Sequence, residues 1–574
     1  MGKYIKGIDR GQLVLFNNCI DDMVAQDNYV RVIDLFVEHL NLKELGFDKA
    51  EENSIGTDFY DPKDLLKLYL YGYRNGVRSS RKLQKLCEVN IEVMWLLRKV
   101  TPNFRTISEF RKKHVNQLKN VFKQTVLMCS DLNMLSGEYS QDGVKIEAVN
   151  SKEKNFTLNK IDEYINRLDK KITEYLSQMD EMDKRETKNE LDNMISKEEL
   201  KEKIEEKKKN LEKYENYRKD MERNNQSQKS LTDEDSRLMK NNGKFSVAYN
   251  NQVAVDTKTH VVVNYDVNNN PADVGTINKV SEEIKETTKE DIIINTTDKG
   301  YNDRQDMSKC LENGIIPQVT LPEGKQYYEL EFEYEENEIT EEELKSTKPE
   351  DVKKCLKAGK VPEVYKDYLE EVEIKEKTKT ETIEEAEEYK ETLTDEEMRD
   401  IALKEKCFVK NRETDRVYCP EGEILRRKSK KGDGIKYCNK LACKNCKNPC
   451  TSAKFKELVM RKDQFISSSN KKVKEKYNVE KSKPKKKRTK TKVVKMKLYV
   501  KEEIIKKRMS TSEHVHGTMK RTDTLSYFLL KGKEKVNGEI GLYYAASNIR
   551  RIVNVIGVEK LIEYYEQKVK KIIV

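Results

Sequence analysis

Three short motifs place acidic side chains in a lysine-rich chain. They are Asp142-Gly143, Asp298-Lys299-Gly300-Tyr301 and Glu513-His514, the last of which is followed by Lys520. Two divalent metals about 4 Å apart need shared carboxylate ligands, and such a metal pair catalyses in-line displacement at phosphorus. Basic side chains draw the phosphate backbone of a nucleic acid toward the metals. The three motifs therefore predict metal-dependent chemistry on DNA.

Each motif also has a simpler interpretation. An Asp-Gly pair such as Asp142-Gly143 is often a plain turn. On a helix, Glu513 and Lys520 share a face, so the glutamate can complete a metal site while the lysine contacts phosphate. The alternative for this pair is an ordinary ion pair on a solvated helix. At Asp298 the functional interpretation is stronger, because Lys299 adds a cation beside the carboxylate.

The distribution of charge along the chain is uneven. The 574 residues are 36% hydrophobic and 37% charged, with a net charge of +10. Residues 321–400 hold 28 acidic against 13 basic side chains, whereas residues 401–574 hold 47 basic against 19 acidic ones. The C-terminal third is therefore expected to face a polyanion. The sequence has no apolar stretch of about 18 residues and no signal-peptide core, which predicts a cytoplasmic protein without a membrane partner.

The first 132 residues predict an all-helical domain. Apolar spacing predicts helices over residues 30–42 and 64–73, and Pro62 opens the second. A basic turn then precedes another helix, which is compatible with a DNA-binding helical domain. We therefore expect DNA contacts from Arg78, Arg81 and Lys82. Any small helical bundle would show the same spacing, so a structural role stays open.

The middle of the chain predicts an α/β core of the ribonuclease-H-like class. The expected order is strand, strand, strand, helix, strand, helix, strand, with the first strand in residues 133–152 and the others in residues 241–321. In this order the strands of Asp142 and Asp298 are neighbours. Apolar residues at three- and four-residue spacing predict an inserted coiled-coil hairpin over residues 153–240, either a spacer or a dimerisation arm.

Four further segments complete the predicted organisation. They are an acidic, weakly folded insertion over residues 322–400, a cysteine-rich module over 401–465, a basic segment over 466–508, and C-terminal helices carrying Glu513 over 509–574. Clustered thiolates in a reducing compartment suit a tetrahedral zinc ion. The expected zinc ligands are Cys419, Cys443, Cys446 and Cys450, with Cys438 as a substitute for the fourth. The alternative is a set of free cysteines.

A longer set of motifs follows one order along the chain. It comprises Lys3-Tyr4-Ile5-Lys6-Gly7, Leu70-Tyr71-Gly72-Tyr73, Arg78-Ser79-Ser80-Arg81-Lys82-Leu83, Asp142-Gly143, Ala148-Val149-Asn150-Ser151-Lys152, Tyr249-Asn250 with Gln252, Asp298-Lys299-Gly300-Tyr301, and Glu513-His514 with Gly517-Thr518. In this order the motifs closely resemble those of bacterial DDE insertion-sequence transposases. The branch they resemble is the one numbered eleven eighty-two in insertion-sequence nomenclature. The resemblance covers nearly the whole chain apart from the acidic insertion and the lysine run.

The resemblance implies a ribonuclease-H-like catalytic domain in which Asp142, Asp298 and Glu513 hold two Mg²⁺ or Mn²⁺ ions. It implies a transposase that binds the terminal inverted repeats of its own element, cuts there, and lets the freed 3′-hydroxyl attack target DNA. Lys520 looks like the basic partner that follows the catalytic glutamate, and Arg508 like an aid to phosphate binding. His516 departs from the family pattern, because relatives usually carry phenylalanine there.

The resemblance also implies partners. The expected partners are double-stranded DNA, as transposon ends and target, and at least one further copy of the chain, since two ends must be paired. The expected location is the cytoplasm, in association with the nucleoid. A different class of function is a DNA-binding protein without catalysis, such as a domesticated transposase. The presence of all three carboxylates favours the enzyme.

Overall fold

The computed structural model describes most of the chain. The described residues are 19–48, 59–184, 190–224, 226–241, 243–382, 394–411, 415–431, 434–461, 464–470, 472–473, 486–521 and 525–573. The motif at residues 3–7 and the start of the lysine run at Lys483 lie outside them. The chain forms two compact units, the first from Met1–Asn155, Ser230–Lys377 and Thr491–Val574, the second from Phe156–Lys229 and Thr378–Lys490. All three candidate carboxylates belong to the first unit.

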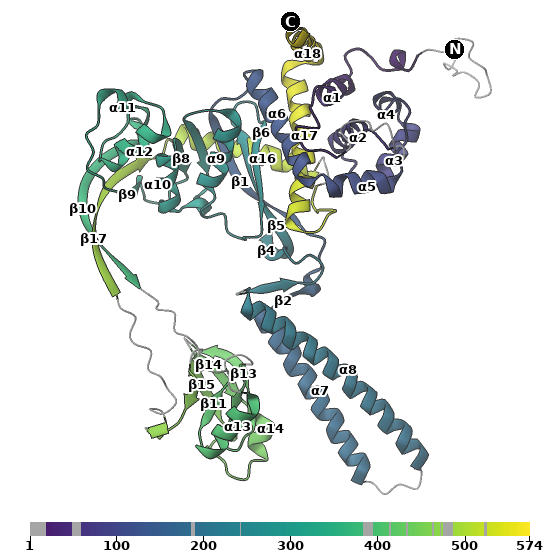
Figure 1. The fold of residues 1–574 in the computed structure, drawn as a ribbon, viewed down its shortest axis with the longest axis vertical. Helices are drawn as coiled ribbons and strands as arrows, with labels where there is room; N and C mark the ends of the chain where they lie inside the picture. The colour runs from purple at the N-terminus through teal and green to yellow at the C-terminus, as the bar shows by residue number, and fades with distance from the viewer. Residues whose placement is uncertain are drawn as a thin grey trace, which may run out of the picture. The chain divides into compact units, whose positions relative to one another are not determined.

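The first unit contains a mixed sheet with the strand order β6-β5-β1-β7-β8 (Figure 1). The strands are β1 (Glu138–Glu147), β5 (Lys244–Asp256), β6 (Val262–Asn268), β7 (Ile293–Thr297) and β8 (Ile315–Val319). The first three pair antiparallel, and β7 pairs in parallel with both β1 and β8. A short strand, β4 (Arg237–Asn241), pairs with the start of β5. This arrangement fits the predicted ribonuclease-H-like core.

Helices cover both faces of this sheet. Helix α9 (Ile277–Thr288) follows β6, α10 (Arg304–Glu312) follows β7, and α16 (Glu502–Arg521) comes from far along the chain. Ser140 Oγ of β1 lies 3.0 Å from Ser512 Oγ of α16. The next residue, Gln141, instead accepts a hydrogen bond from Asn295, whose amide also donates to Ser281 of α9. Successive strand residues point to opposite faces, so Asp142 faces α16, and Gly143 lies on the α9 face.

The two ends of the chain share one helical bundle. The N-terminal helices are α1 (Tyr29–Glu38), α2 (Pro62–Arg74), α3 (Ser80–Val89), α4 (Ile91–Leu96), α5 (Phe104–Lys113) and α6 (Val115–Asp131), and the C-terminal ones are α17 (Lys533–Ile556) and α18 (Val558–Ile573). A Cβ on Gly538 of α17 would lie 2.9 Å from the backbone of Val115, so glycine permits the close approach of α17 to α6. The predicted C-terminal segment is thus divided between the sheet, which α16 covers, and this bundle.

The expectation of a weakly folded acidic insertion is wrong for residues 322–382. This stretch contains β9 (Tyr327–Glu333), α11 (Glu341–Lys345), α12 (Pro349–Lys357), η4 (Glu363–Tyr365) and β10 (Leu369–Thr382). Tyr328, Leu330 and Phe332 of β9 are buried, and the glutamates between them are exposed. The acidic side chains therefore occupy the solvent face of a folded element, and their number alone gave a misleading signal. Residues 383–393 lie outside the described part.

The second unit consists of two long helices and a small sheet. Helices α7 (Leu158–Lys184) and α8 (Glu190–Arg223) occupy the predicted hairpin (Figure 1), and the rings of Tyr164 and Tyr214 stack between them at 5.2 Å. A supercoil of the two helices stays a prediction. The cysteine-rich segment forms a sheet with the order β15-β14-β13-β12-β11-β16, whose strands are Glu457–Arg461, Gly434–Cys438, Ile424–Lys431, Val417–Tyr418, Phe408–Lys410 and Ile466–Ser467. Helices α13 (Asp395–Lys404) and α14 (Lys440–Lys444) accompany it.

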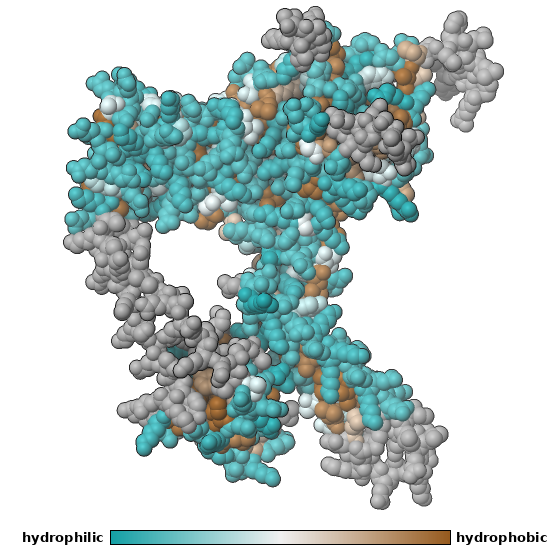
Figure 2. All heavy atoms as spheres, in the orientation of Figure 1, coloured by the Kyte–Doolittle hydropathy of each residue, from teal (hydrophilic) through white to brown (hydrophobic). Residues whose placement is uncertain are grey.

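Paired strands connect the two units. Strand β2 (Asn155–Thr157) pairs with β3 (Gln228–Ser230), and β17 (Lys486–Tyr499) lies between β10 and β9 in a three-stranded sheet. Hydrophilic residues cover most of the visible surface (Figure 2). Within the residues described above, no helix has the length and apolar character needed to span a membrane.

Candidate active site

Asp142 lies within strand β1, so the interpretation of Asp142-Gly143 as a plain turn does not hold. Its Oδ1 atom accepts a hydrogen bond from the Gly143 amide at 2.8 Å. Burial raises the pKa of Asp142 to about 6, and the nearby carboxylates of Asp298 and Asp273 add to this rise, whereas the Gly143 amide and Arg508 oppose it. A carboxylate whose ionised form is disfavoured by burial is stabilised in that form when a cation binds.

Asp298 stands directly after β7, the parallel neighbour of β1. It caps the short helix η3 (Lys299–Tyr301), because its Oδ1 accepts a hydrogen bond from the Gly300 amide at 2.7 Å. The side chain is half-buried, and its charge contributes to the raised pKa of Asp142. The prediction that these two aspartates lie at or just beyond neighbouring strands of one sheet is therefore confirmed.

Glu513 lies on α16, the helix that Asp142 faces, and its side chain is exposed. Among the residues that the structure describes, no three His, Cys, Asp or Glu side chains are close enough together to hold a metal ion. The structure therefore brings Asp142 and Asp298 near each other and places Glu513 on the covering helix, without a closed cluster of the three.

Basic side chains of α16 surround Asp142. Arg508 Nη1 lies 4.0 Å and His516 Nδ1 3.6 Å from Asp142 Oδ2. Burial, aided by the positive charge of Lys520, lowers the pKa of His516 to about 4, so its imidazole is neutral at pH 7. Burial also lowers the pKa of Lys520, and the charge of Asp142 opposes that shift. Arg508 and Lys520 therefore lie where a phosphate next to Asp142 would need cations.

The other predicted DNA contacts differ in exposure. Lys299, Arg81 and Lys82 are exposed, and the Arg81 guanidinium lies over the ring of Phe104. Arg78 is only 6% exposed, and its Nη1 donates to the backbone oxygen of Tyr527 at 2.8 Å.

The burial of Arg78 argues against the predicted DNA contact. The same nitrogen lies 3.4 Å from the carboxylate of Glu539, which is fully buried. This carboxylate also accepts hydrogen bonds from the backbone amides of Leu529 and Leu530. Arg78 therefore joins the N-terminal helices to the segment that follows α16, which is a structural role.

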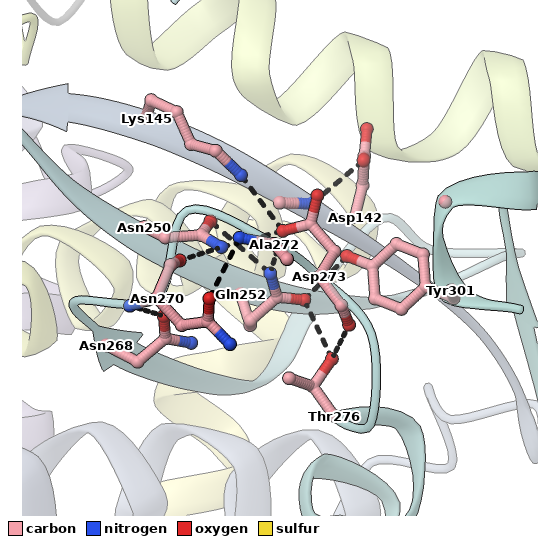
Figure 3. A network of polar contacts seen from close by, with 12 residues as sticks. Asp142, Lys145, Asn250, Gln252, Asn268, Asn270, Ala272, Asp273, Thr276 and Tyr301 are labelled. Carbon is pink, nitrogen blue, oxygen red and sulfur yellow. Dashed lines mark hydrogen bonds and ion pairs between the residues drawn. The ribbon is translucent and has the colours of Figure 1, made fainter. Parts of the chain in front are cut away.

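A polar network that was not predicted lies on the face of β1 opposite to the Asp142 side chain (Figure 3). Asp273, in the loop between β6 and α9, accepts hydrogen bonds at Oδ1 from Lys145 at 2.9 Å, Asn250 at 2.7 Å and Gln252 at 2.6 Å. Tyr301 donates its hydroxyl to Gln252 Oε1 at 2.5 Å. The only signal in the sequence was that Asn250, Gln252 and Tyr301 belonged to the motifs of the family resemblance. Nothing in the sequence marked Asp273.

The predicted zinc ligands belong to the second unit, where no three described cysteines lie close enough together to hold a metal ion. Cys419, Cys443, Cys446 and Cys450 all line one cavity of about 40 Å³, whereas Cys438 does not. Burial raises the pKa of the Cys419 thiol, and the nearby Cys450 and Cys446 add to that rise. Cys450 and Cys446 therefore lie near Cys419. The cavity therefore favours Cys419 over Cys438 as the fourth member of the group.

Two family comparisons agree with this geometry. The family described as "Transposase DDE domain" matches residues 219–549, and the family described as "Transposase domain (DUF772)" matches residues 18–113. The first match includes Asp298 and Glu513, whereas Asp142 precedes it. Neither the search of curated proteins nor the search of solved structures found a match. Because the first family spans more than half of the chain, the protein belongs to the DDE transposase domain family.

Proposed function

We propose that the protein binds the terminal inverted repeats of its own insertion sequence and catalyses metal-dependent DNA cleavage and strand transfer. The observation that carries the proposal is the placement of Asp142 on β1 and of Asp298 just after its parallel neighbour β7, next to a helix that bears Glu513. By resemblance, the element belongs to the branch numbered eleven eighty-two. The active complex contains double-stranded DNA and at least two copies of the chain, since two ends must be paired.

The residues present suit Mg²⁺ or Mn²⁺. These ions prefer carboxylate oxygen ligands. Burial, with a smaller contribution from Asp298 and Asp273, raises the pKa of Asp142, so a bound cation would favour its ionised form. Asp142, Asp298 and Glu513 would hold two ions, with Glu513 completing the set after a side-chain rearrangement. Bound there, the ions would activate the attacking hydroxyl and stabilise the leaving oxygen of an in-line displacement.

The chain's own cations have distinct tasks. Arg508 and Lys520 bind the scissile phosphate beside Asp142, and Lys299 adds a cation at the turn of Asp298. Arg81 and Lys82 contact the phosphate backbone away from the reaction centre. Phosphate contacts of this kind position DNA without reading its sequence.

A cleavage assay tests the proposal. The purified full chain is incubated with a duplex carrying the DNA that flanks its gene, in Mg²⁺ or Mn²⁺, and the products are tested for a free 3′-hydroxyl. Asp298→Asn and Glu513→Gln are expected to abolish cleavage and to leave DNA affinity within a few-fold. The matched control is Glu503→Gln, because Glu503 is also exposed on α16. DNA binding without cleavage by the wild-type chain in either metal would instead support a binding protein without catalysis.

We also propose a structural Zn²⁺ held by Cys419, Cys443, Cys446 and Cys450. The cavity that the four side chains line supports it. Burial raises the pKa of Cys419 and of Cys450, and neighbouring thiols of the group add to both rises. Metal analysis of the purified chain should find about one zinc per chain. Cys446→Ser should lose it and Cys438→Ser should keep it. A wild-type chain without zinc would identify the group as free cysteines.

A further inference from the structure

Tyr301 belongs to the same short motif as Asp298 but points into the protein. Its side chain is fully buried, whereas Asp298 is half-buried and caps the η3 turn through the Gly300 amide. The Tyr301 hydroxyl donates to Gln252 Oε1 of β5 at 2.5 Å. The turn that carries Asp298 is therefore tied to the sheet by one buried hydrogen bond.

Gln252 extends this connection to strand β1. It stands opposite Gly143 in the β1–β5 register, and its Nε2 donates to Asp273 Oδ1 at 2.6 Å. Asp273 also forms an ion pair with Lys145, whose side chain projects from the same face of β1 as Gly143. Figure 3 shows these side chains converging on the Asp273 carboxylate.

Gly143 leaves the space that this contact needs. A Cβ at this position would lie 2.5 Å from Asp273 Oδ1 and 2.7 Å from Gln252 Nε2, which is closer than real side chains approach. The residue after Asp142 is therefore packed directly against the network. At one end the chain of hydrogen bonds contacts the strand of Asp142, and at the other it holds the turn of Asp298.

We propose that the chain Tyr301–Gln252–Asp273 is a positioning device that fixes the separation of the Asp142 and Asp298 carboxylates for metal binding. The inference rests on the proposed function, because it concerns the metal site of that reaction. All three residues act through the aspartates and do not contact DNA. Partners behind metal ligands fix ligand orientation, and their loss typically lowers metal affinity or activity about 10- to 100-fold.

Simple core packing is the competing explanation, and the network allows the two to be separated. Gln252 Oε1 also accepts from Gln141 at 3.1 Å and from Thr276 at 3.4 Å, so it keeps donors when the Tyr301 hydroxyl is removed. Tyr301→Phe therefore should leave the fold intact. A packing role changes thermal stability alone, whereas a positioning role also changes the metal concentration that the site needs.

The test compares Tyr301→Phe with Tyr365→Phe. Tyr365 is equally buried in the same unit and donates its hydroxyl to the Leu311 carbonyl at 2.7 Å, rather than to a residue of the network. Melting temperature is measured against Mn²⁺ concentration, and cleavage against Mg²⁺ concentration. We expect similar losses of metal-free stability, but only Tyr301→Phe should need about tenfold more metal for half-saturation in both assays.

A second variant keeps the proposal open to refutation if Tyr301→Phe fails to fold. Asp273→Asn keeps an acceptor oxygen but removes the charge, and it should raise the metal requirement in the same way. The double variant should raise the metal requirement no more than the single variant with the larger effect, because both substitutions break the same series of hydrogen bonds. Tyr301→Phe and Asp273→Asn with the metal dependence of Tyr365→Phe would overturn the inference. A wild-type chain that neither cleaves DNA nor gains stability from Mn²⁺ would instead overturn the proposed function.

Discussion

Replacing Asp142 with asparagine should stabilise the metal-free protein while abolishing its activity. The raised pKa of Asp142, about 6 against 3.8 for an unperturbed aspartate, means that the fold opposes its ionisation. Two pKa units correspond to about 3 kcal/mol, and since the side chain is 23% exposed we expect about 1–3 kcal/mol. The introduced asparagine would keep an oxygen for the Gly143 amide and carry no charge.

The stability gained by Asp142→Asn should increase with pH. Because the folded-state pKa of Asp142 lies above the unfolded one, its neutral form stabilises the fold fully below about pH 4. That stabilisation is lost as the pH rises through 6. The advantage of Asp142→Asn over the wild type should therefore be largest near pH 8 and about half as large near pH 5, where the unfolded wild type is still ionised.

Urea unfolding in EDTA measures this difference. The chain has a single tryptophan, Trp95, which packs against the same hydrophobic cluster as Val144 of β1, so its fluorescence follows the unit that holds Asp142. Asp367→Asn is the control, because Asp367 is 81% exposed and its replacement should change stability by less than about 0.5 kcal/mol. Mn²⁺ should stabilise the wild type and not Asp142→Asn. A less stable variant at pH 8, or a pH-independent difference, would refute the reasoning.

Four further substitutions probe other contacts of the first unit. Gly143→Ala should lower unfolding free energy by about 1–3 kcal/mol, because its methyl group meets Asp273, and equilibrium unfolding measures the loss. Arg78→Met should lower the unfolding free energy by about 3–5 kcal/mol, because it leaves the buried carboxylate of Glu539 without its cation. In gel-shift titrations, Arg81→Met should weaken DNA binding more than Arg78→Met does. Lys520→Gln should reduce the slope of log affinity against log salt by about one, and an unchanged slope would remove Lys520 from the phosphate contacts.

The parts of the fold that the sequence predicted are those with local signals. Alternating and continuous apolar runs predicted the strands of the core, and the positions of Asp142 and Asp298 relative to those runs predicted their adjacency. In β9 the same alternation was present in Tyr328, Leu330 and Phe332. The acidic composition of the segment masks this alternation, although alternation is the more direct evidence for a strand.

The parts that could not be predicted depend on partners far along the chain. Asp273 acquires its role from Lys145, 128 positions away, and a single aspartate in an Asn-rich loop carries no local mark of that. Arg78 pairs with the buried Glu539, 461 positions away, so this arginine of the basic turn is not free to bind DNA, whereas Arg81 and Lys82 are exposed. Periodicity shows which face of an element is buried, but not which polar side chain it will meet.

The distance of Glu513 along the chain from the two aspartates follows from how the second unit is attached. Its first segment leaves through β2 and returns through β3, which pair with each other. Its second leaves through β10 and returns through β17, which are also neighbours in one sheet. Paired strands hold the two ends of each inserted segment together, so the length of the segment has little effect on the core. The entropy lost on closing such a loop also grows only slowly with its length. Strand β17 then leads directly into α16, and this connection, rather than the number of intervening residues, sets where Glu513 lies relative to Asp142.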